Sequence, residues 1–223
     1  MSGLVDTFFN LQVMQQYLPK IIEGMGLTLV LAIVVVITGL VAGFILAVIR
    51  SLQIRPANWL IVLFADVFRA VPPLVILIII YFAFPTIGIR FSGFASAWLG
   101  LSLVLAAFAE EIVWAGILSV PRGQWEAARA TGLDFWQSMR LVVLPQAARL
   151  TIAPLTSRAI VITKNTALAP VVAVGEILYQ AQAAYSFSYN PSPLTLGAIA
   201  YLILFIPLVW LGRWVETRFA WKR

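Results

Sequence analysis

Cysteine and histidine are both absent from this 223-residue chain, and charged residues make up only 11% of it. Without cysteine there is no disulfide, thiol nucleophile or thiolate metal site, and without histidine there is no imidazole relay or H-E-x-x-H zinc motif. Soluble domains carry roughly a quarter charged residues. Hydrophobic residues make up 62% of this chain, so its polar surface cannot cover a soluble globule. We therefore expect an all-α integral membrane protein with no metal site and no cofactor of its own.

Five apolar stretches are long enough to cross a membrane, which takes about 20 residues in a helix. They are residues 24–49, 59–84, 96–120, 150–174 and 194–211. Pro72 and Pro73 must break the hydrogen-bond ladder inside the second stretch. The expectation is a helical bundle with five transmembrane helices, forming a single transmembrane domain over residues 1–223.

Residues 1–20 lack the features of a cleaved signal. They contain an acidic residue, Asp6, and no early basic cluster, and no small-residue cleavage site follows. Their apolar side chains predict an amphipathic segment on the membrane surface. These side chains are Phe8, Phe9, Leu11, Met14, Tyr17 and Leu18. A poorly ordered tail is the alternative.

Basic residues predict the orientation, because short cytoplasmic loops collect lysine and arginine. Only Lys20 and Arg90 fall on one side of the predicted spans, against ten basic residues on the other. The ten are Arg50, Arg55, Arg122, Arg129, Arg140, Arg149, Arg213, Arg218, Lys222 and Arg223. We expect the N-terminus outside and the C-terminus in the cytoplasm. This topology accounts for the net charge of +6 without any nucleic acid partner.

The longest loop on the predicted cytoplasmic side, residues 121–149, begins with a helix signal. Residues 124–131 are rich in alanine, glutamate and arginine, which are good helix formers. Gly132 follows as a left-handed terminator.

A second helix signal follows in the same loop. Asp134 and Gln137 have the spacing of a capping box, and the helix is expected to end at Leu144 and Pro145. The two signals predict a compact cytoplasmic helix-turn-helix. An ordinary loop on the membrane surface is the alternative.

The same loop carries a spaced motif. Glu126-Ala127-Ala128, then Gly132, then Val142-x-Leu144-Pro145 match the spacing E-A-A-x3-G-x9-I-x-L-P. This motif resembles the EAA signature of membrane permeases of ABC importers. Further matches resemble the polar amino acid branch of that family: GLTL at 26–29, FRAVPPLV at 68–75, AAFAEEI at 106–112 and VGEIL at 174–178.

The resemblance implies the type I ABC importer permease fold, in which the loop docks into a groove on a separate ATPase. It implies that Glu126 faces a basic group of the ATPase and that Gly132 sets the turn. The implied coupling residues are Gly123, Glu126, Ala127, Ala128, Gly132, Leu144 and Pro145.

The resemblance also implies partners and a location. The chain has no G-x-x-x-x-G-K-[ST] phosphate loop, so it is not expected to be an enzyme, and ATP-Mg would bind the partner ATPase. The expected partners are two copies of that ATPase, a second permease that is identical or related, an extracytoplasmic solute-binding protein and the lipid membrane. The expected location is the bacterial inner membrane.

Ionisable side chains inside the spans are costly and mark transport pathways or ion pairs. Arg69 lies beside the Pro72 break and could hold a carboxylate in a bidentate manner. Glu111 matches the usual glutamate of the family and is the expected anion of a substrate path, whereas Glu110 is expected to pair with a basic residue. Arg69 could instead simply neutralise Asp66, three residues earlier.

The fourth stretch adds Lys164, Asn165 and Thr166, which resemble the Lys-Asp-Thr run of the family with asparagine in place of the acid. Asn165 and Thr166 could hydrogen-bond to a polar substrate side chain. Lys164 could instead extend toward the membrane surface from a span end. The candidates for the substrate path are therefore Arg69, Glu111, Lys164, Asn165, Thr166 and Asp66.

The favoured function is the permease of an ATP-driven importer for a polar amino acid. Two other functions remain open: a transporter driven by an ion gradient through the intramembrane carboxylates, and a membrane scaffold for a cytoplasmic protein.

Overall fold

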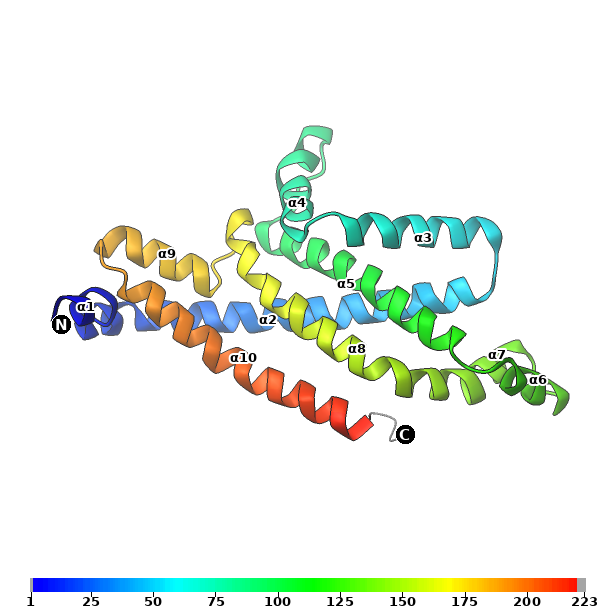
Figure 1. Cartoon of the computed structure of the whole chain (residues 1–223). Helices are drawn as coiled ribbons and strands as arrows, with labels where there is room; N and C mark the ends of the chain where they lie inside the picture. The colour runs from blue at the N-terminus through cyan, green and yellow to red at the C-terminus, as the bar shows by residue number, and fades with distance from the viewer. Residues whose placement is uncertain (1, 220–223) are drawn as a thin grey trace. The chain divides into compact units, whose positions relative to one another are not determined.

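The computed structural model describes residues 2–219, which contain helices and no β-strand (Figure 1). In chain order the elements are α1 (Ser2–Phe8), α2 (Leu11–Ser51), α3 (Arg55–Ala70), α4 (Pro73–Ile78), the π-helix η1 (Ile79–Ala83), the 3₁₀-helix η2 (Phe84–Ile87), α5 (Gly93–Leu118), α6 (Arg122–Ala130), α7 (Phe135–Ser138), the π-helix η3 (Met139–Val143), α8 (Leu144–Lys164), the 3₁₀-helix η4 (Asn165–Val172), α9 (Ile177–Ser188) and α10 (Ser192–Phe219). The predicted cytoplasmic residues Lys222 and Arg223 lie outside the described range. The all-α expectation is confirmed.

Among residues 2–219, three helical segments are long and apolar enough to cross a membrane: Asp6–Ser51, Gly93–Leu118 and Ser192–Phe219. Two further candidates pass the same test only when two consecutive helices, separated by a short break, are counted as one segment. These pairs are Arg55–Ala70 with Pro73–Ile87, and Phe135–Val172 with Ile177–Ser188. The predicted number of five spans is therefore reached only if each interrupted pair forms one span.

The second predicted span is divided into two helical segments, α3 and the segment that begins with α4, because the chain leaves the helical conformation before each proline. Val71 and Pro72 have ψ angles of 130° and 136°, and α4 begins at Pro73. A residue that precedes proline is disfavoured in the α region, and proline has no N–H to continue the ladder.

The N-terminal residues fold into α1 and the first turns of α2. At 1.5 Å per residue, the 41 residues of α2 extend for about 60 Å, roughly twice the hydrocarbon thickness of a bilayer. Residues 11–20 are thus continuous with the first apolar stretch. That residues 1–20 lie on the membrane surface stays a prediction.

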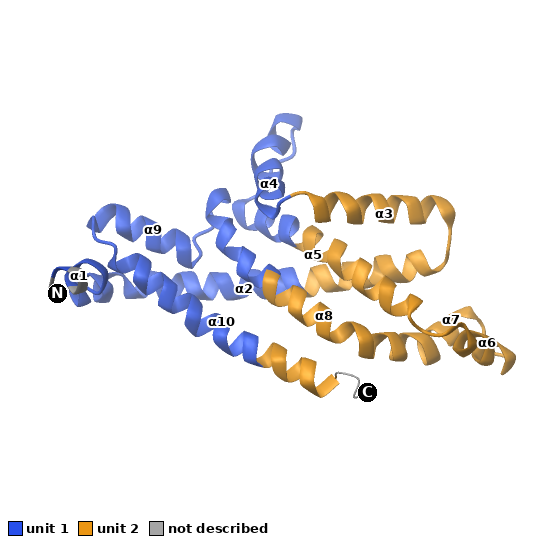
Figure 2. Ribbon diagram, in the orientation of Figure 1, with its two compact units in different colours: residues 1–36, 72–101, 162–210 blue, residues 37–71, 102–161, 211–223 orange. Residues whose placement is uncertain are grey.

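Contacts divide the chain into two compact units, each assembled from segments that are distant in sequence (Figure 2). The first comprises residues 1–36, 72–101 and 162–210, and the second comprises residues 37–71, 102–161 and 211–223. Four boundaries fall inside α2, α5, α8 and α10, and a fifth lies between α3 and α4, so no single cut in the sequence separates the units.

Each unit has its own apolar core. In the first unit, Ile21 of α2 packs with Ile177 and Ala181 of α9 and Ala200 of α10. In the second unit, one cluster joins α2, α5, η3 and α8. Its buried members are Ala47, Val113, Ile117, Val120, Met139, Val143 and Ala147.

Candidate coupling segment and intramembrane charges

The predicted turn between two short helices forms at Gly132. α6 covers Arg122–Ala130, and Gly132 follows with a φ of 90°. The Leu133 N–H donates to the Ala128 carbonyl at 3.3 Å, and the Gly132 N–H donates to the Arg129 carbonyl at 3.0 Å. These two bonds form a Schellman motif, which satisfies carbonyls that the end of a helix leaves free.

The second helix begins with the predicted capping box. The Asp134 carboxylate accepts the Gln137 backbone N–H at 2.8 Å, and the Gln137 side chain accepts the Asp134 backbone N–H at 2.9 Å. Together, the motif at Gly132 and this box determine where α6 ends and where α7 begins.

The prediction that Leu144 and Pro145 end the second helix is wrong. The helical chain continues from Phe135 through the π-helix η3 and into α8 up to Lys164. The Leu144 N–H donates to the Met139 carbonyl five residues earlier. Pro145 lacks an N–H, and its ring crowds the carbonyl four residues before it. The wider π-turn makes room for the proline, so the helix continues where an α-helix would stop.

An apolar cluster anchors this coupling segment, which we define as residues 121–149, to the apolar helices. Met139 and Val143 are buried against Val113 and Ile117 of α5 and Ala47 of α2, with Trp125 and Phe135 packed on the cluster. The rings of Trp125 and Phe135 stack with their centroids 5.6 Å apart, which ties α6 to α7. Figure 1 shows α6 and α7 together beyond the C-terminal end of α5. A force on α6 can therefore pass directly to α2 and α5.

The predicted coupling residues occupy different faces of the segment. Gly123, Glu126, Ala127, Gly132 and Pro145 are exposed. Ala128 is buried and Leu144 packs on the apolar cluster, so these two support the segment from within.

A cavity of about 490 Å³ lies beside α6, between it and the ends of α2 and α5. Arg122, Glu126 and Arg129 line it on the α6 side, and Trp114 and Leu118 line it on the α5 side. Glu126 thus lies between Arg122 and Arg129 on the exposed side of α6.

A buried ion pair joins α2 to α5. The Arg50 guanidinium contacts both oxygens of Glu110, at 3.0 and 3.2 Å, and the Glu110 side chain is 0% exposed. Arg50 also lies over the Trp114 ring, 4.9 Å from its centroid. Pairing of Glu110 with a basic residue was expected. The expectation that Arg50 is a loop residue is wrong, because α2 continues to Ser51.

Two charged residues of the predicted substrate path, Arg69 and Glu111, form a salt bridge with each other. Arg69 Nη1 donates to Glu111 Oε2 at 2.7 Å, and both side chains are partly exposed. The alternative in which Arg69 neutralises Asp66 is not the arrangement found, because the guanidinium binds Glu111. Asp66 is exposed on α3.

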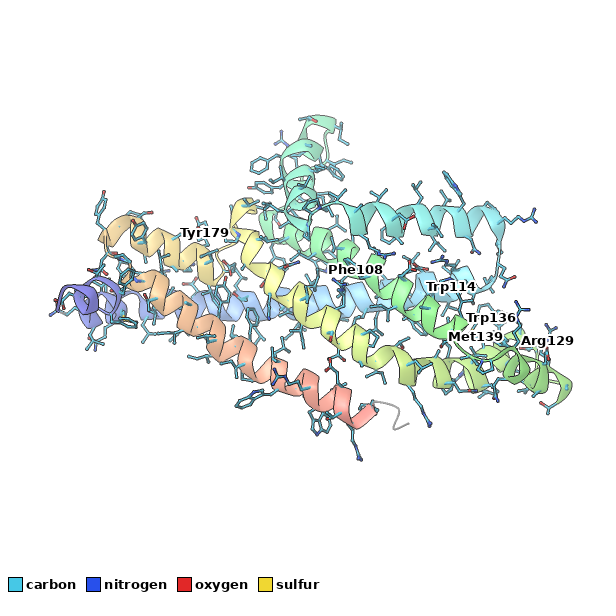
Figure 3. All side chains as sticks on the ribbon, viewed as in Figure 1. Phe108, Trp114, Arg129, Trp136, Met139 and Tyr179 are labelled. Atoms are coloured by element: carbon cyan, nitrogen blue, oxygen red, sulfur yellow. The ribbon has the colours of Figure 1, made fainter. Side chains whose placement is uncertain are left out.

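Arg158 and Phe108 join this pair and were not among the predicted site residues. The Arg158 guanidinium carbon lies 3.8 Å from the centroid of the Phe108 ring, and that of Arg69 lies 5.7 Å from it (Figure 3 labels Phe108 on α5). Two guanidinium groups therefore lie at one aromatic ring, and one of them, that of Arg69, is paired with Glu111. The signal for Arg158 was present in the sequence, as an arginine inside an apolar stretch.

The remaining path candidates lie where α8 passes into η4. Lys164 is exposed at the last residue of α8, and Asn165 is half-buried at the first residue of η4. Thr166 is fully buried, and its hydroxyl donates to the Thr163 carbonyl at 2.8 Å. The Thr166 hydroxyl proton is therefore already used by the backbone.

A second buried carboxylate, Glu176, organises the start of α9, a helix that lies between the fourth and fifth predicted spans. Its side chain accepts the Tyr179 backbone N–H at 3.0 Å and the hydroxyl of Tyr201 from α10. Gly24 of α2 approaches so closely that an added Cβ would lie 3.0 Å from the Glu176 backbone. Glu176 thus caps α9 and connects it to α10.

Known proteins resemble this chain over most of its length. The family described as "Binding-protein-dependent transport system inner membrane component" matches residues 39–221. The probable amino-acid ABC transporter permease protein YckA of Bacillus subtilis is 38% identical over 177 residues, which cover 79% of this chain and 78% of YckA. The arginine transport system permease protein ArtQ of the same organism is 33% identical over 203 residues, which cover 90% of this chain and 93% of ArtQ. The glutamate/aspartate import permease protein GltK of Escherichia coli O157:H7 is 34% identical over 167 residues, with 71% and 75% coverage.

Solved structures of ABC transporters also resemble this chain. A chain of a structure described as an amino acid ABC transporter with histidines aligns with a TM-score of 0.83 and 30% identity, covering 92% of this chain and 96% of that one. A chain of the MetNI methionine ABC transporter in an inward-facing conformation shares the fold, with a TM-score of 0.73 and 23% identity. The chain therefore belongs to the family of inner membrane components of binding-protein-dependent transport systems: it is a multi-pass permease subunit of an ABC importer, and not itself an enzyme.

Proposed function

We propose that this permease moves a polar amino acid into a bacterial cell, driven by ATP hydrolysis on a separate ATPase. The observation that carries the proposal is the pairing of Arg69 with Glu111 on two helices of the second unit. An amino acid presents a carboxylate and an ammonium group. When this ion pair opens, it offers one complementary charge to each. The names of the relatives described above support an amino acid as the substrate class.

The coupling segment is the proposed contact with the ATPase. Glu126 is exposed, Gly132 determines the turn, and the apolar cluster connects α6 to the ends of α2 and α5. The ATPase shifts the permease between inward-open and outward-open states because it binds the two states with different affinity.

The proposed assembly contains two ATPase copies, which bind ATP-Mg, and a second permease that is either a copy of this chain or a related one. An extracytoplasmic solute-binding protein delivers the substrate. The N-terminus faces outside and the C-terminus the cytoplasm, in keeping with the ten basic residues on one side. Lys164, Asn165, Thr166 and Asp66 stay candidates for the substrate path.

The test is uptake of radiolabelled amino acids by cells with and without this gene, the rest of the transporter being present. We expect deletion to abolish the uptake of at least one polar amino acid and the gene supplied in trans to restore it. Unchanged uptake of every amino acid tested would contradict the proposal.

A further inference from the structure

Arg158 is a cation without a carboxylate partner among residues 2–219. Its guanidinium lies over the Phe108 ring, 3.8 Å from the centroid, and no salt bridge of Arg158 is present among the described residues. The Arg158 side chain is half-buried and the residue lies inside α8. A cation–π contact offsets only part of the cost of placing a guanidinium in an apolar surrounding.

The surrounding of Arg158 lies deep in the apolar region. Phe108 and Glu111 belong to α5, which spans Gly93–Leu118. At 1.5 Å per residue, both residues lie within about 9 Å of the middle of this helix, which places them inside a hydrocarbon core about 30 Å thick if α5 crosses it centrally. An unpaired charge at this depth marks a substrate or ion pathway by default.

The charges around Phe108 do not balance. Arg69 and Arg158 bring two positive charges and Glu111 brings one negative charge. A zwitterionic amino acid, with its carboxylate on Arg69 and its ammonium on Glu111, leaves Arg158 unpaired. A substrate with one more carboxylate neutralises the cluster. Both guanidinium groups contact the same ring, so a single small molecule can reach them both.

We propose that Arg158 binds the side-chain carboxylate of an acidic amino acid, while Arg69 and Glu111 hold its α-carboxylate and α-ammonium group. The proposal rests on the amino acid transport proposed above and makes its substrate class L-glutamate or L-aspartate. Arginine suits this role because its fork of N–H donors matches a carboxylate in a bidentate manner.

The test is equilibrium binding to the permease, isolated together with its ATPase through a tag on this chain and placed in lipid nanodiscs. Radiolabelled L-glutamate, L-glutamine and L-arginine are each used as a probe, and L-aspartate and succinate compete with labelled L-glutamate. No solute-binding protein is present, so the specificity measured belongs to the permease. We expect L-aspartate to compete well and L-glutamine to bind about tenfold more weakly or worse, because it lacks a charge-assisted hydrogen bond. Succinate should bind weakly, since it has no ammonium group for Glu111.

Three variants separate charge from packing. Arg158→Gln should lower the affinity for L-glutamate about tenfold or more and leave that for L-glutamine unchanged. Arg158→Lys should keep the preference for L-glutamate, because it keeps the charge. Phe108→Leu removes the ring that both guanidinium groups contact, so it should weaken the binding of L-glutamate and L-glutamine alike. Arg90→Gln, an exposed arginine outside this cluster, is the matched control and should change nothing.

The outcomes are distinguishable. Equal binding of L-glutamate and L-glutamine by the wild type, or an unchanged preference in Arg158→Gln, would overturn the assignment of Arg158 while leaving amino acid transport intact. If L-arginine or L-glutamine binds and L-glutamate does not, the acidic class is likewise excluded. Failure of every amino acid to bind, in a complex that still contains the ATPase, would refute the proposed function itself.

Discussion

At the scale of single residues, Gly132 shows how one position determines a turn. Its φ is 90°, and a Cβ added there meets no atom within 4 Å. A side chain at this position therefore meets strain in the backbone and no steric clash. For Gly132→Val we expect a cost of about 1 kcal/mol or more and the loss of ATPase co-purification and uptake, with membrane insertion unchanged.

Gly132→Asn is the matched control, because asparagine tolerates the left-handed conformation better than other residues with a side chain. It should retain most of the uptake. If Gly132→Val transports normally, the turn has no role in coupling.

A second prediction at this scale concerns the ion pair of Arg50 and Glu110. Glu110→Ala leaves the mostly buried Arg50 cation without its carboxylate partner, and such a loss costs about 3 kcal/mol or more in soluble proteins. The thermal unfolding midpoint of the purified permease should fall clearly. Replacing both residues with leucine should recover much of the loss, because no uncompensated charge remains.

Glu23→Gln serves as the reference, since Glu23 pairs with Lys20 at a similar distance of 3.0 Å with both side chains 64% exposed. Exposed pairs contribute about 0–1 kcal/mol, so its midpoint should barely move. Similar shifts for Glu110→Ala and Glu23→Gln would contradict a structural role of the buried pair.

At the scale of elements, the π-helix η3 offsets α7 from α8 by one residue. Pro145→Ala restores an N–H and removes the ring, so we expect η3 to relax toward a regular α-helix. Losing one residue of offset turns α7 by about 100° around the axis. Phe135 would then leave its stacking contact with Trp125. Uptake should fall although the helix gains a hydrogen bond, and normal uptake would indicate that the offset is unimportant.

Local signals in the sequence were sufficient to predict the long apolar helices and the turn between α6 and α7. The left-handed Gly132 and the capping box of Asp134 depend only on neighbouring residues, and both are confirmed. The partner of Arg69 depends on packing between α3 and α5, and no rule of sequence spacing assigns Glu111 to it over Asp66. The continuation of the helix across Pro145 also could not be predicted, because a proline is compatible both with a π-turn and with an ordinary helix end.

At the scale of the whole molecule, the membrane topology is open to direct test. The ten basic residues on one side predict a cytoplasmic C-terminus and an external loop at residues 186–193. A reporter enzyme that works only in the cytoplasm should be active when it is fused after the C-terminal residue. A tag in the loop at residues 186–193 should react with an impermeant reagent added to intact cells. Finding both on the same side would show that residues 194–211 do not cross the membrane and would contradict the five-span topology.

The central claim is that ATP hydrolysis on a separate chain drives transport through this permease. The most direct measurement is amino acid accumulation in proteoliposomes that contain the complete complex, with the solute-binding protein supplied on the side opposite the ATPase. We predict accumulation with ATP and none with a non-hydrolysable analogue or with an imposed proton or sodium gradient. Accumulation driven by a gradient without ATP would indicate a secondary transporter and contradict the account, as would an intact ATPase complex that hydrolyses ATP but moves no amino acid.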